Sequence, residues 1–189
     1  MFETIRQADE QLFLFLNKLG SESQDGFWLL ITNKWSAIPI YALLAYLIFK
    51  SFKLKGLIYF LILASLMILV TDQTSNLFKY SVERLRPCHS PWLDGLYRMV
   101  ADRCGGQYGF FSAHAANTAA LAVLVGKSLA KSYKFAFPLM LIWTLLVAYS
   151  RIYVGVHFPG DVLFGMFIGG FYGFLFLNTW NYIRRKIQA

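Results

Sequence analysis

Long apolar segments, separated by clusters of lysine and arginine, constrain this chain more than any other feature of its sequence. They occupy residues 27–49, 56–80, 112–125, 135–150 and 159–182. Lys34 interrupts the first segment near its start, so the membrane entry could instead lie near Trp35. A helix needs roughly 20 mainly apolar residues to cross the hydrocarbon core of a bilayer. Only 15% of the residues are charged, against about 25% in an ordinary soluble domain. The pattern predicts an all-α, polytopic membrane helical bundle with five spanning helices.

The N-terminal residues 2–19 differ from these segments, because their one apolar run, Leu12 to Leu16, is short and follows several charges. We predict an amphipathic helix within residues 1–25 that lies in the membrane interface and stops at Gly20. It would be the sixth helix of a single domain formed by residues 1–189. If it crossed the membrane instead, only the side of the N-terminus would change.

Basic residues are concentrated at 50–55, 127–134 and 184–186, and these clusters contain no acidic residue. With five spans all three clusters fall on one side, which the positive-inside rule assigns to the cytoplasm. The loop 81–111 and the turn 151–158 then share the outer face. Topology therefore explains the net charge of +8, and we predict no nucleic-acid partner, because the sequence lacks a basic stripe with interleaved aromatic residues.

Three cations are expected at the outer face. Lys79 and Arg86 lie seven residues apart, so a continuing helix would place them on one side. Arg151 ends the fourth predicted span. Arginine binds phosphate oxygens in a bidentate manner and lysine acts as a point charge. Three such groups at one membrane depth indicate an anion site better than they indicate side chains that merely snorkel to the interface.

Two further segments supply polar groups to the same face. Ser112 follows a glycine-containing loop and precedes a helical run, which is typical of an N-cap. The amides of Ala113 and His114 would then point outward at a helix N-terminus, where a phosphate fits. His157 and Asp161 are spaced i and i+4, so the carboxylate can orient the imidazole. A nucleophilic histidine needs such a partner.

These clusters resemble the three-part signature of the type 2 phosphatidic acid phosphatase superfamily, which includes membrane lipid-phosphate phosphatases and vanadium haloperoxidases. The parts are Lys79 with Arg86-Pro87, then Ser112-Ala113-His114, then Ser150-Arg151 with His157 and Asp161. The family's middle part usually reads Pro-Ser-Gly-His, whereas Phe111 and Ala113 stand here for proline and glycine. Alanine keeps the backbone amide, so the departure leaves the expected chemistry in place.

The resemblance implies a role for each of these residues. His157 would attack phosphorus and form a phosphohistidine, Asp161 would orient it, and His114 would protonate the leaving oxygen. The phosphate oxygens would be held by the side chains of Lys79, Arg86, Ser112 and Arg151, together with the amides of Ala113 and His114. Neither a metal ion nor an organic cofactor is implied.

Short bacterial members of this superfamily make undecaprenyl pyrophosphate the first expected substrate. Phosphatidylglycerophosphate, phosphatidic acid and lipid A phosphate are the alternatives. The resemblance thus implies a hydrolase of the bacterial inner membrane that takes a lipid phosphate from the bilayer at its outer face. Two other classes, a vanadate-dependent oxidase and a non-catalytic transport or lipid-binding protein, would be separated by activity without vanadate and by the effect of His157→Ala.

Two other pairs of residues each allow two interpretations. Asp72 and Asn76 share a helical face with Lys79, and could support the phosphate site or join two helices. Cys88 and Cys104 flank the outer loop, where an oxidising compartment permits a disulfide and where two free thiols are also compatible. A bridge would stabilise this loop by roughly 3 kcal/mol.

Overall fold

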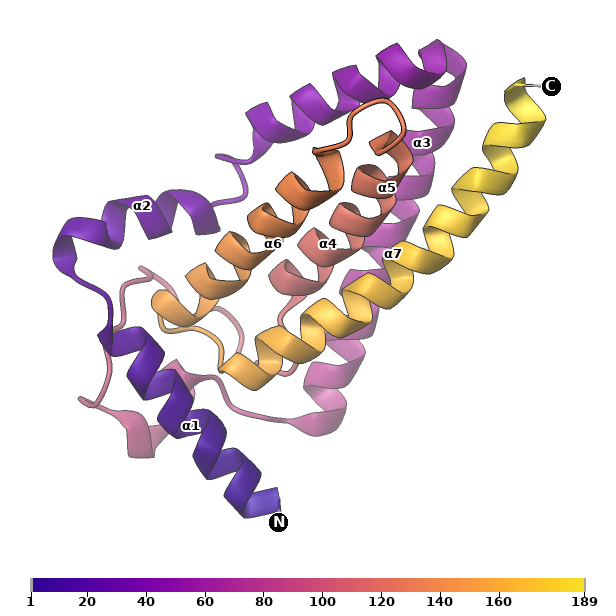
Figure 1. Ribbon diagram of the computed structural model, residues 1–189. Coiled ribbons are helices and arrows are strands. Elements are labelled where there is room, and N and C mark those ends of the chain that lie inside the picture. Colours follow the sequence, from indigo (N-terminus) through magenta and orange to yellow (C-terminus); the bar gives the residue numbers. More distant parts are fainter. Residues whose placement is uncertain (1, 189) are drawn as a thin grey trace.

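The computed structural model describes residues 2–188, and these residues form a bundle of helices (Figure 1). Within them there is no β-strand, and the only β contact is a bridge between Leu85 and Tyr108. The all-α class is therefore confirmed. The α-helices are α1 (Phe2–Lys18), α2 (Glu22–Thr32), α3 (Ile38–Val82), α4 (Ala113–Leu121), α5 (Lys127–Leu129), α6 (Ala136–Tyr153) and α7 (Pro159–Gln188).

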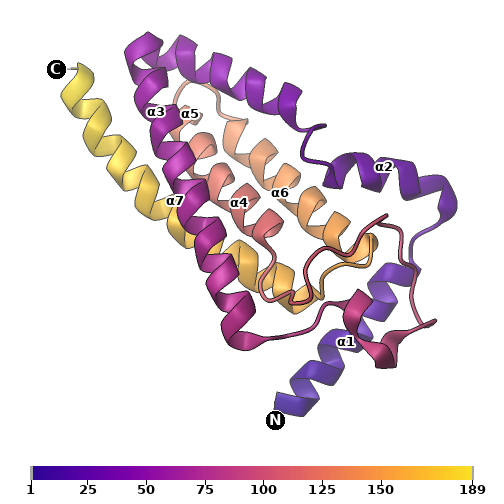
Figure 2. The same cartoon turned by 180° about the vertical axis from the view of Figure 1, so that it is seen from behind.

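Three helices are long and apolar enough to cross a membrane, namely α3, α6 and α7. The first of these, α3, is broken at Lys53, where φ is 61°, and Figure 2 shows it bending sharply there into two limbs. The limbs correspond to the first two predicted spans. The third predicted span is formed by α4, a π-helical stretch at Ala122–Gly126, and α5. The membrane bundle is confirmed, whereas the number of crossings, five, stays a prediction.

The first predicted span begins later than its apolar sequence suggests. Residues 27–32 belong to the separate helix α2, and α3 starts only at Ile38. Between them the side chains of Asn33 and Ser36 bond to nearby backbone: Asn33 Oδ1 accepts from Trp35 N at 2.9 Å, and Ser36 Oγ donates to Asn33 O at 2.7 Å. Such local bonds compete with the helical pattern, which is why the apolar run is interrupted.

The closest packing in the bundle joins α4 to α7. Gly165, Gly169 and Gly173 lie one turn apart on α7 and face the backbone of α4. A Cβ atom built at Gly169 would stand 2.0 Å from the carbonyl oxygen of Ala116. Small residues let two helices approach closely inside a membrane bundle. This contact sets the distance between the two helices that carry the second and third parts of the predicted signature.

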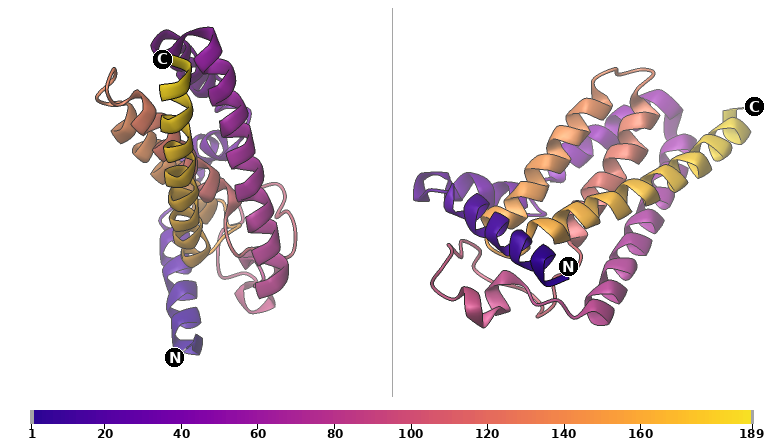
Figure 3. Two further views of the ribbon diagram at one scale, coloured as in Figure 1. Left: turned by 90° about the vertical axis from the view of Figure 1, so that its right-hand side faces the viewer. Right: turned by 60° about the horizontal axis from the view of Figure 1, so that its bottom comes forward.

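One end of the bundle gathers the segments expected at the outer face. The loop between α3 and α4, the turn between α6 and α7, and α1 lie together at the bottom of Figure 1, and Figure 3 shows α1 running across this end. Phe13 and Asn17 of α1 are fully buried, whereas most of its other residues are exposed. The predicted N-terminal segment 1–25 thus holds two helices, because α1 ends at Lys18 and α2 begins at Glu22.

The bend of α3, the loop between α5 and α6, and the C-terminal end of α7 lie at the opposite end of the bundle (Figures 1 and 2). These segments contain the three basic clusters at 50–55, 127–134 and 184–186. The clusters therefore share one end, as the sequence predicts.

A separate apolar core surrounds Trp180, which is fully buried between Phe52 and Phe60.

Candidate active site

His157 lies in the turn between α6 and α7 and is 2% exposed. Its Nδ1 lies 3.4 Å from Asp161 Oδ2, and its Nε2 lies 3.2 Å from Arg86 Nη1. Burial, followed by the positive charges of Arg86, Arg151 and Lys79, lowers the pKa of His157 well below its usual range. The imidazole is therefore held neutral, which leaves a ring nitrogen with a free electron pair.

Asp161 lies in the first turn of α7 and is fully buried. Its Oδ2 also accepts a hydrogen bond from the backbone N of Phe158 at 3.1 Å. Its backbone carbonyl accepts a hydrogen bond from Ser112 N at 3.0 Å, so α4 and α7 are joined at their N-terminal ends. The carboxylate occupies the Nδ1 side of the imidazole, and Nε2 is consequently the nitrogen that faces the cations.

Arg86 follows α3 and is 8% exposed. Besides its contact with His157, its Nε donates to Tyr108 O at 3.2 Å and its Nη1 donates to Val156 O at 3.4 Å. Burial lowers the pKa of Arg86, and the negative charge of Asp161 opposes that effect. The loop backbone thus fixes the guanidinium beside the imidazole.

Two other cations complete this cluster. Arg151 lies in the last turn of α6, and its Nη1 donates to Thr32 Oγ1 at the end of α2. Its Nε is buried and has no hydrogen-bond partner among the described residues. Lys79 lies half-buried in the last turn of α3. Like charges gathered in this way repel one another, and an anion with several oxygen atoms would relieve the repulsion.

The middle part of the signature begins α4. Ser112 is the fully buried N-cap, and its Oγ accepts from Ala115 N at 3.5 Å. Ala113 and His114 are the first two helical residues, so their amides lie among the unpaired donors of the helix N-terminus. His114 lines a cavity of about 310 Å³ between α2, α3, α4 and α6. The structure thus places this histidine between the cation cluster and an open space.

The two residues predicted on α3, Asp72 and Asn76, lie in different surroundings. Asp72 Oδ1 accepts from Asn117 Nδ2 of α4 at 2.8 Å, and both residues line the cavity beside His114. Asn76 is exposed on the surface of α3. Asp72 therefore joins α3 to α4, which is the interhelical contact that the sequence left open as one of two possibilities.

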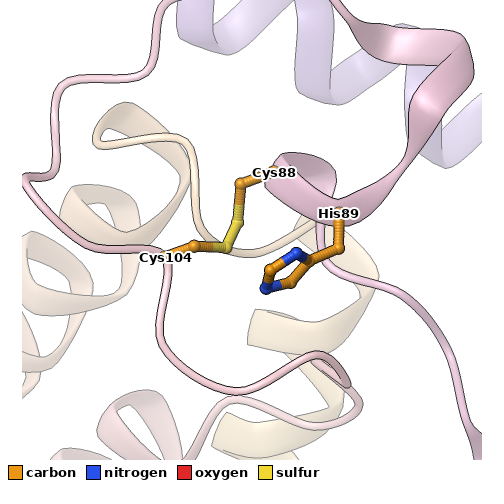
Figure 4. A group of neighbouring side chains, drawn as sticks. All are labelled: Cys88, His89 and Cys104. Carbon is orange, nitrogen blue, oxygen red and sulfur yellow. A yellow bond between two sulfur atoms is a disulfide. The ribbon is translucent and has the colours of Figure 1, made fainter.

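Cys88 and Cys104 form a disulfide in the loop between α3 and α4, with a Cα–Cα distance of 6.1 Å and with His89 beside it (Figure 4). The bridge closes the loop that follows Arg86. On the far side, a Cβ at Gly105 would lie 3.8 Å from the Arg86 guanidinium. Both ends of the disulfide-closed loop are therefore close to this cation.

Several residues of the site carry no signal in the motif pattern. Arg84 pairs with Asp161, and Asp9 of α1 pairs with Arg84. Thr32 and Asn117 bond to Arg151 and Asp72. Arg84 lies inside the spacing between Lys79 and Arg86, where a further cation could have been noticed. Asp9, by contrast, resembles any acid on the polar side of an amphipathic helix.

Comparison with known proteins identifies relatives of this arrangement. A family model described as the PAP2 superfamily matches residues 53–185. A lipid A 4'-phosphatase of Bacteroides thetaiotaomicron is 35% identical over 192 residues, covering 100% of this chain and 84% of that protein. An undecaprenyl-diphosphatase of Sulfolobus acidocaldarius is 33% identical over 166 residues, covering 87% and 67%.

A solved structure has the same fold. It is the transmembrane PAP2-type phosphatidylglycerolphosphate phosphatase of Bacillus subtilis, with a TM-score of 0.75 and 22% sequence identity. The likeness covers 95% of this chain and 88% of that one. The whole helical arrangement, and not only the segment matched by the family model, is therefore shared.

Proposed function

The chain belongs to the PAP2 superfamily, and we propose that it removes a phosphate group from a glycolipid of the lipid A type through a phosphohistidine intermediate. The family membership establishes a membrane-embedded lipid phosphatase, a hydrolase that acts on phosphate esters or diphosphates. The substrate, the roles of individual residues and the side of the membrane are the parts that we propose.

The observation that carries the proposal is the meeting of three cations around one buried, neutral imidazole. Arg86 Nη1 lies 3.2 Å from His157 Nε2, and the charges of Arg151 and Lys79 also act on this ring. Phosphoryl transfer requires a positioned nucleophile and positive charge around the equatorial oxygens more than it requires other covalent chemistry. The cluster supplies both in one place.

The proposed reaction has two steps. In the first, His157 Nε2 attacks phosphorus, a nitrogen–phosphorus bond forms, and the bond between phosphorus and the leaving oxygen breaks. His114 gives its proton to that oxygen, and Asp161 stabilises the charge that develops on the His157 ring through Nδ1. In the second step, water attacks phosphorus, His114 takes its proton, and inorganic phosphate leaves while His157 is restored.

The cavities next to His114 support a lipid with a sizeable head group. The leaving oxygen must meet His114, so the remainder of the substrate extends toward the cavity of about 310 Å³. Polar residues, Lys34, Asp72 and Asn117, line part of that cavity. An apolar cavity of about 250 Å³ adjoins it, since Tyr41, Ile68 and Leu121 line both. A head group in the first and an acyl chain in the second would suit this shape.

Among candidate substrates, lipid A phosphate is better supported than undecaprenyl pyrophosphate, the first expectation from the sequence. The B. thetaiotaomicron lipid A 4'-phosphatase aligns with the whole chain, whereas the undecaprenyl-diphosphatase aligns with 87% of it. We further propose that the site faces the periplasm from the bacterial inner membrane. The basic clusters lie at the end of the bundle opposite to His157, and the positive-inside rule assigns that end to the cytoplasm.

Phosphate release by the purified protein in detergent tests the function. The panel contains lipid A, undecaprenyl pyrophosphate, phosphatidic acid and phosphatidylglycerophosphate, and lipid A is expected to be hydrolysed fastest. The change His157→Gln should abolish release, while the matched control His89→Gln in the outer loop should retain it. Rapid quenching without acid should trap an acid-labile phosphoenzyme on the wild type and on His89→Gln, and none on His157→Gln. Equal rates for His157→Gln and wild type would refute the proposed chemistry.

A further inference from the structure

The N-terminal helix α1 reaches the candidate catalytic turn through Asp9. Asp9 Oδ1 accepts from the backbone N of Gly160 at 2.7 Å, and its Oδ2 accepts from Arg84 Nη2 at 2.6 Å. Only glycine leaves room for this approach, because a Cβ at Gly160 would lie 2.8 Å from Asp9 Oδ2. Asp9 stands outside residues 53–185, the part that the family model matches.

Arg84 carries the contact from Asp9 to Asp161. Its Nη1 donates to Asp161 Oδ1 at 2.7 Å, so its two terminal nitrogens bind two different carboxylates. Its guanidinium also lies over the ring of Phe158, 4.2 Å from the ring centroid. A planar guanidinium held on three sides in this way has little freedom to rotate.

Asp161 is in turn fixed at both of its oxygens. Oδ1 accepts from Arg84, whereas Oδ2 accepts from Phe158 N at 3.1 Å and faces His157 Nδ1 at 3.4 Å. The carboxylate is fully buried, so bulk water cannot replace a hydrogen-bond partner that is lost. A continuous series of contacts therefore runs from α1, through Arg84 and Asp161, to the imidazole.

The seating of α1 is secured at a second point. Asn17 is fully buried; its amide nitrogen donates to Tyr153 O at 2.9 Å and to Arg98 O at 3.0 Å, while its oxygen accepts from Arg98 N at 2.7 Å. Asn17 and Asp9 thus hold α1 against the two ends of the turn that contains His157. The helix cannot shift along the turn without breaking one of these contacts.

From this geometry, and resting on the proposed function, we propose that Asp9 and Arg84 are positioning residues for the phosphatase reaction. Asp9 orients Arg84, Arg84 orients Asp161, and Asp161 presents His157 Nε2 to phosphorus. Neither residue needs to touch the substrate. Loss of either one should therefore reduce turnover and leave substrate binding almost unchanged, because the phosphate-binding cations remain in place.

The test is a double-mutant cycle on phosphate release from lipid A. Asp9→Asn retains the oxygen that Gly160 needs and removes the charge that Arg84 needs. We expect kcat to fall about tenfold to a hundredfold, as for a displaced catalytic group, with KM changed by less than about twofold. Arg84→Gln should lower kcat at least as much, and the double variant should resemble Arg84→Gln alone. If Arg84→Gln does not fold, Arg84→Lys, which reaches only one carboxylate, takes its place in the cycle.

Glu10→Gln is the matched control on the same helix. Glu10 Oε1 accepts from Arg6 Nη1 at 2.7 Å and from Trp92 Nε1 at 3.1 Å. Neither of these partners is Arg84, so Glu10 does not belong to the series of contacts that reaches Asp161. This variant should keep the wild-type kcat. Asp9→Asn with unchanged kcat, or effects that multiply in the double variant, would overturn the inference while leaving the proposed function intact. A wild type that releases no phosphate from any lipid would overturn both.

Discussion

The spacing between α4 and α7 should control both stability and turnover, and Gly169→Ala tests this directly. The added Cβ would stand 2.0 Å from Ala116 O, whereas ordinary van der Waals contact begins at 3.4 Å. The helices must therefore separate by the difference between these distances, about 1.4 Å, because packed interiors have no spare volume. Overpacking of this kind costs about 1–3 kcal/mol.

The same separation would act on the site. Ser112 and His114 begin α4, whereas Asp161 begins α7, so a wider interface moves His114, the proposed leaving-group acid, away from Asp161 and the proposed nucleophile His157. A displacement of about 1 Å at a reacting centre costs about 100-fold in rate. We therefore expect Gly169→Ala to lower the melting temperature and to reduce kcat by one to two orders of magnitude, about 10–100-fold.

Gly170→Ala is the control, one residue further along the same helix. A Cβ at Gly170 meets no atom of another described element within 4 Å. Here alanine should only improve helix propensity, by up to about 1 kcal/mol, and leave kcat unchanged. Thermal unfolding in detergent and phosphate release would be measured for both variants. Shifts of the same sign and size in the two proteins would show that close helix packing is not the cause.

Three further changes have defined outcomes. Because the pKa of His157 lies below its usual range, nitrogen-15 NMR of the substrate-free protein should show a neutral ring at pH 6.5. As pH falls, His157 is protonated in the unfolded chain before it is protonated in the folded protein. Its contribution to stability is therefore complete above pH 6.5 and decreases below that pH. Cys88→Ala with Cys104→Ala should lower the unfolding free energy by about 3 kcal/mol, and a reductant should then have no further effect on the melting temperature. Asn17→Ala should cost about 2 kcal/mol or more in chemical unfolding, because it leaves buried backbone groups unpaired; an unchanged midpoint would contradict the clamp.

The fold was predictable wherever a feature depends on local composition. Apolar length located the helices, and basic clusters located the end of the bundle opposite to the site. The start of the first span was harder to place, because residues 27–32 are as apolar as a span and only Lys34 and Trp35 indicate a later membrane entry. The helix is interrupted by the side chains of Asn33 and Ser36, and their effect depends on a specific local geometry that hydrophobicity does not record.

The candidate site divides in the same way. The spacing of Lys79, Arg86 and His157 predicted groups that the structure brings to one end of the bundle. Asn117 was missed because a single amide on a helix next to His114 has no periodicity, and its partner Asp72 lies 45 residues earlier. Contacts of this kind arise only when helices distant in sequence pack side by side.

Charge balance was nevertheless visible before any geometry. The N-terminal residues 2–25 contain five acids and two bases, whereas the segments that meet them at one end of the bundle contribute the cations Lys79, Arg84, Arg86, Arg98 and Arg151. The structure pairs these two populations: Asp9 binds Arg84 at 2.6 Å, and Asp25 binds Arg98 at 2.8 Å. An acidic amphipathic helix beside a cluster of cations therefore has a physical reason to dock there, since each segment lowers the electrostatic cost of the other. In a chain with the same motifs, we expect an N-terminal acid that can reach the arginine lying between the lysine and the arginine of the first motif, as Asp9 reaches Arg84 here.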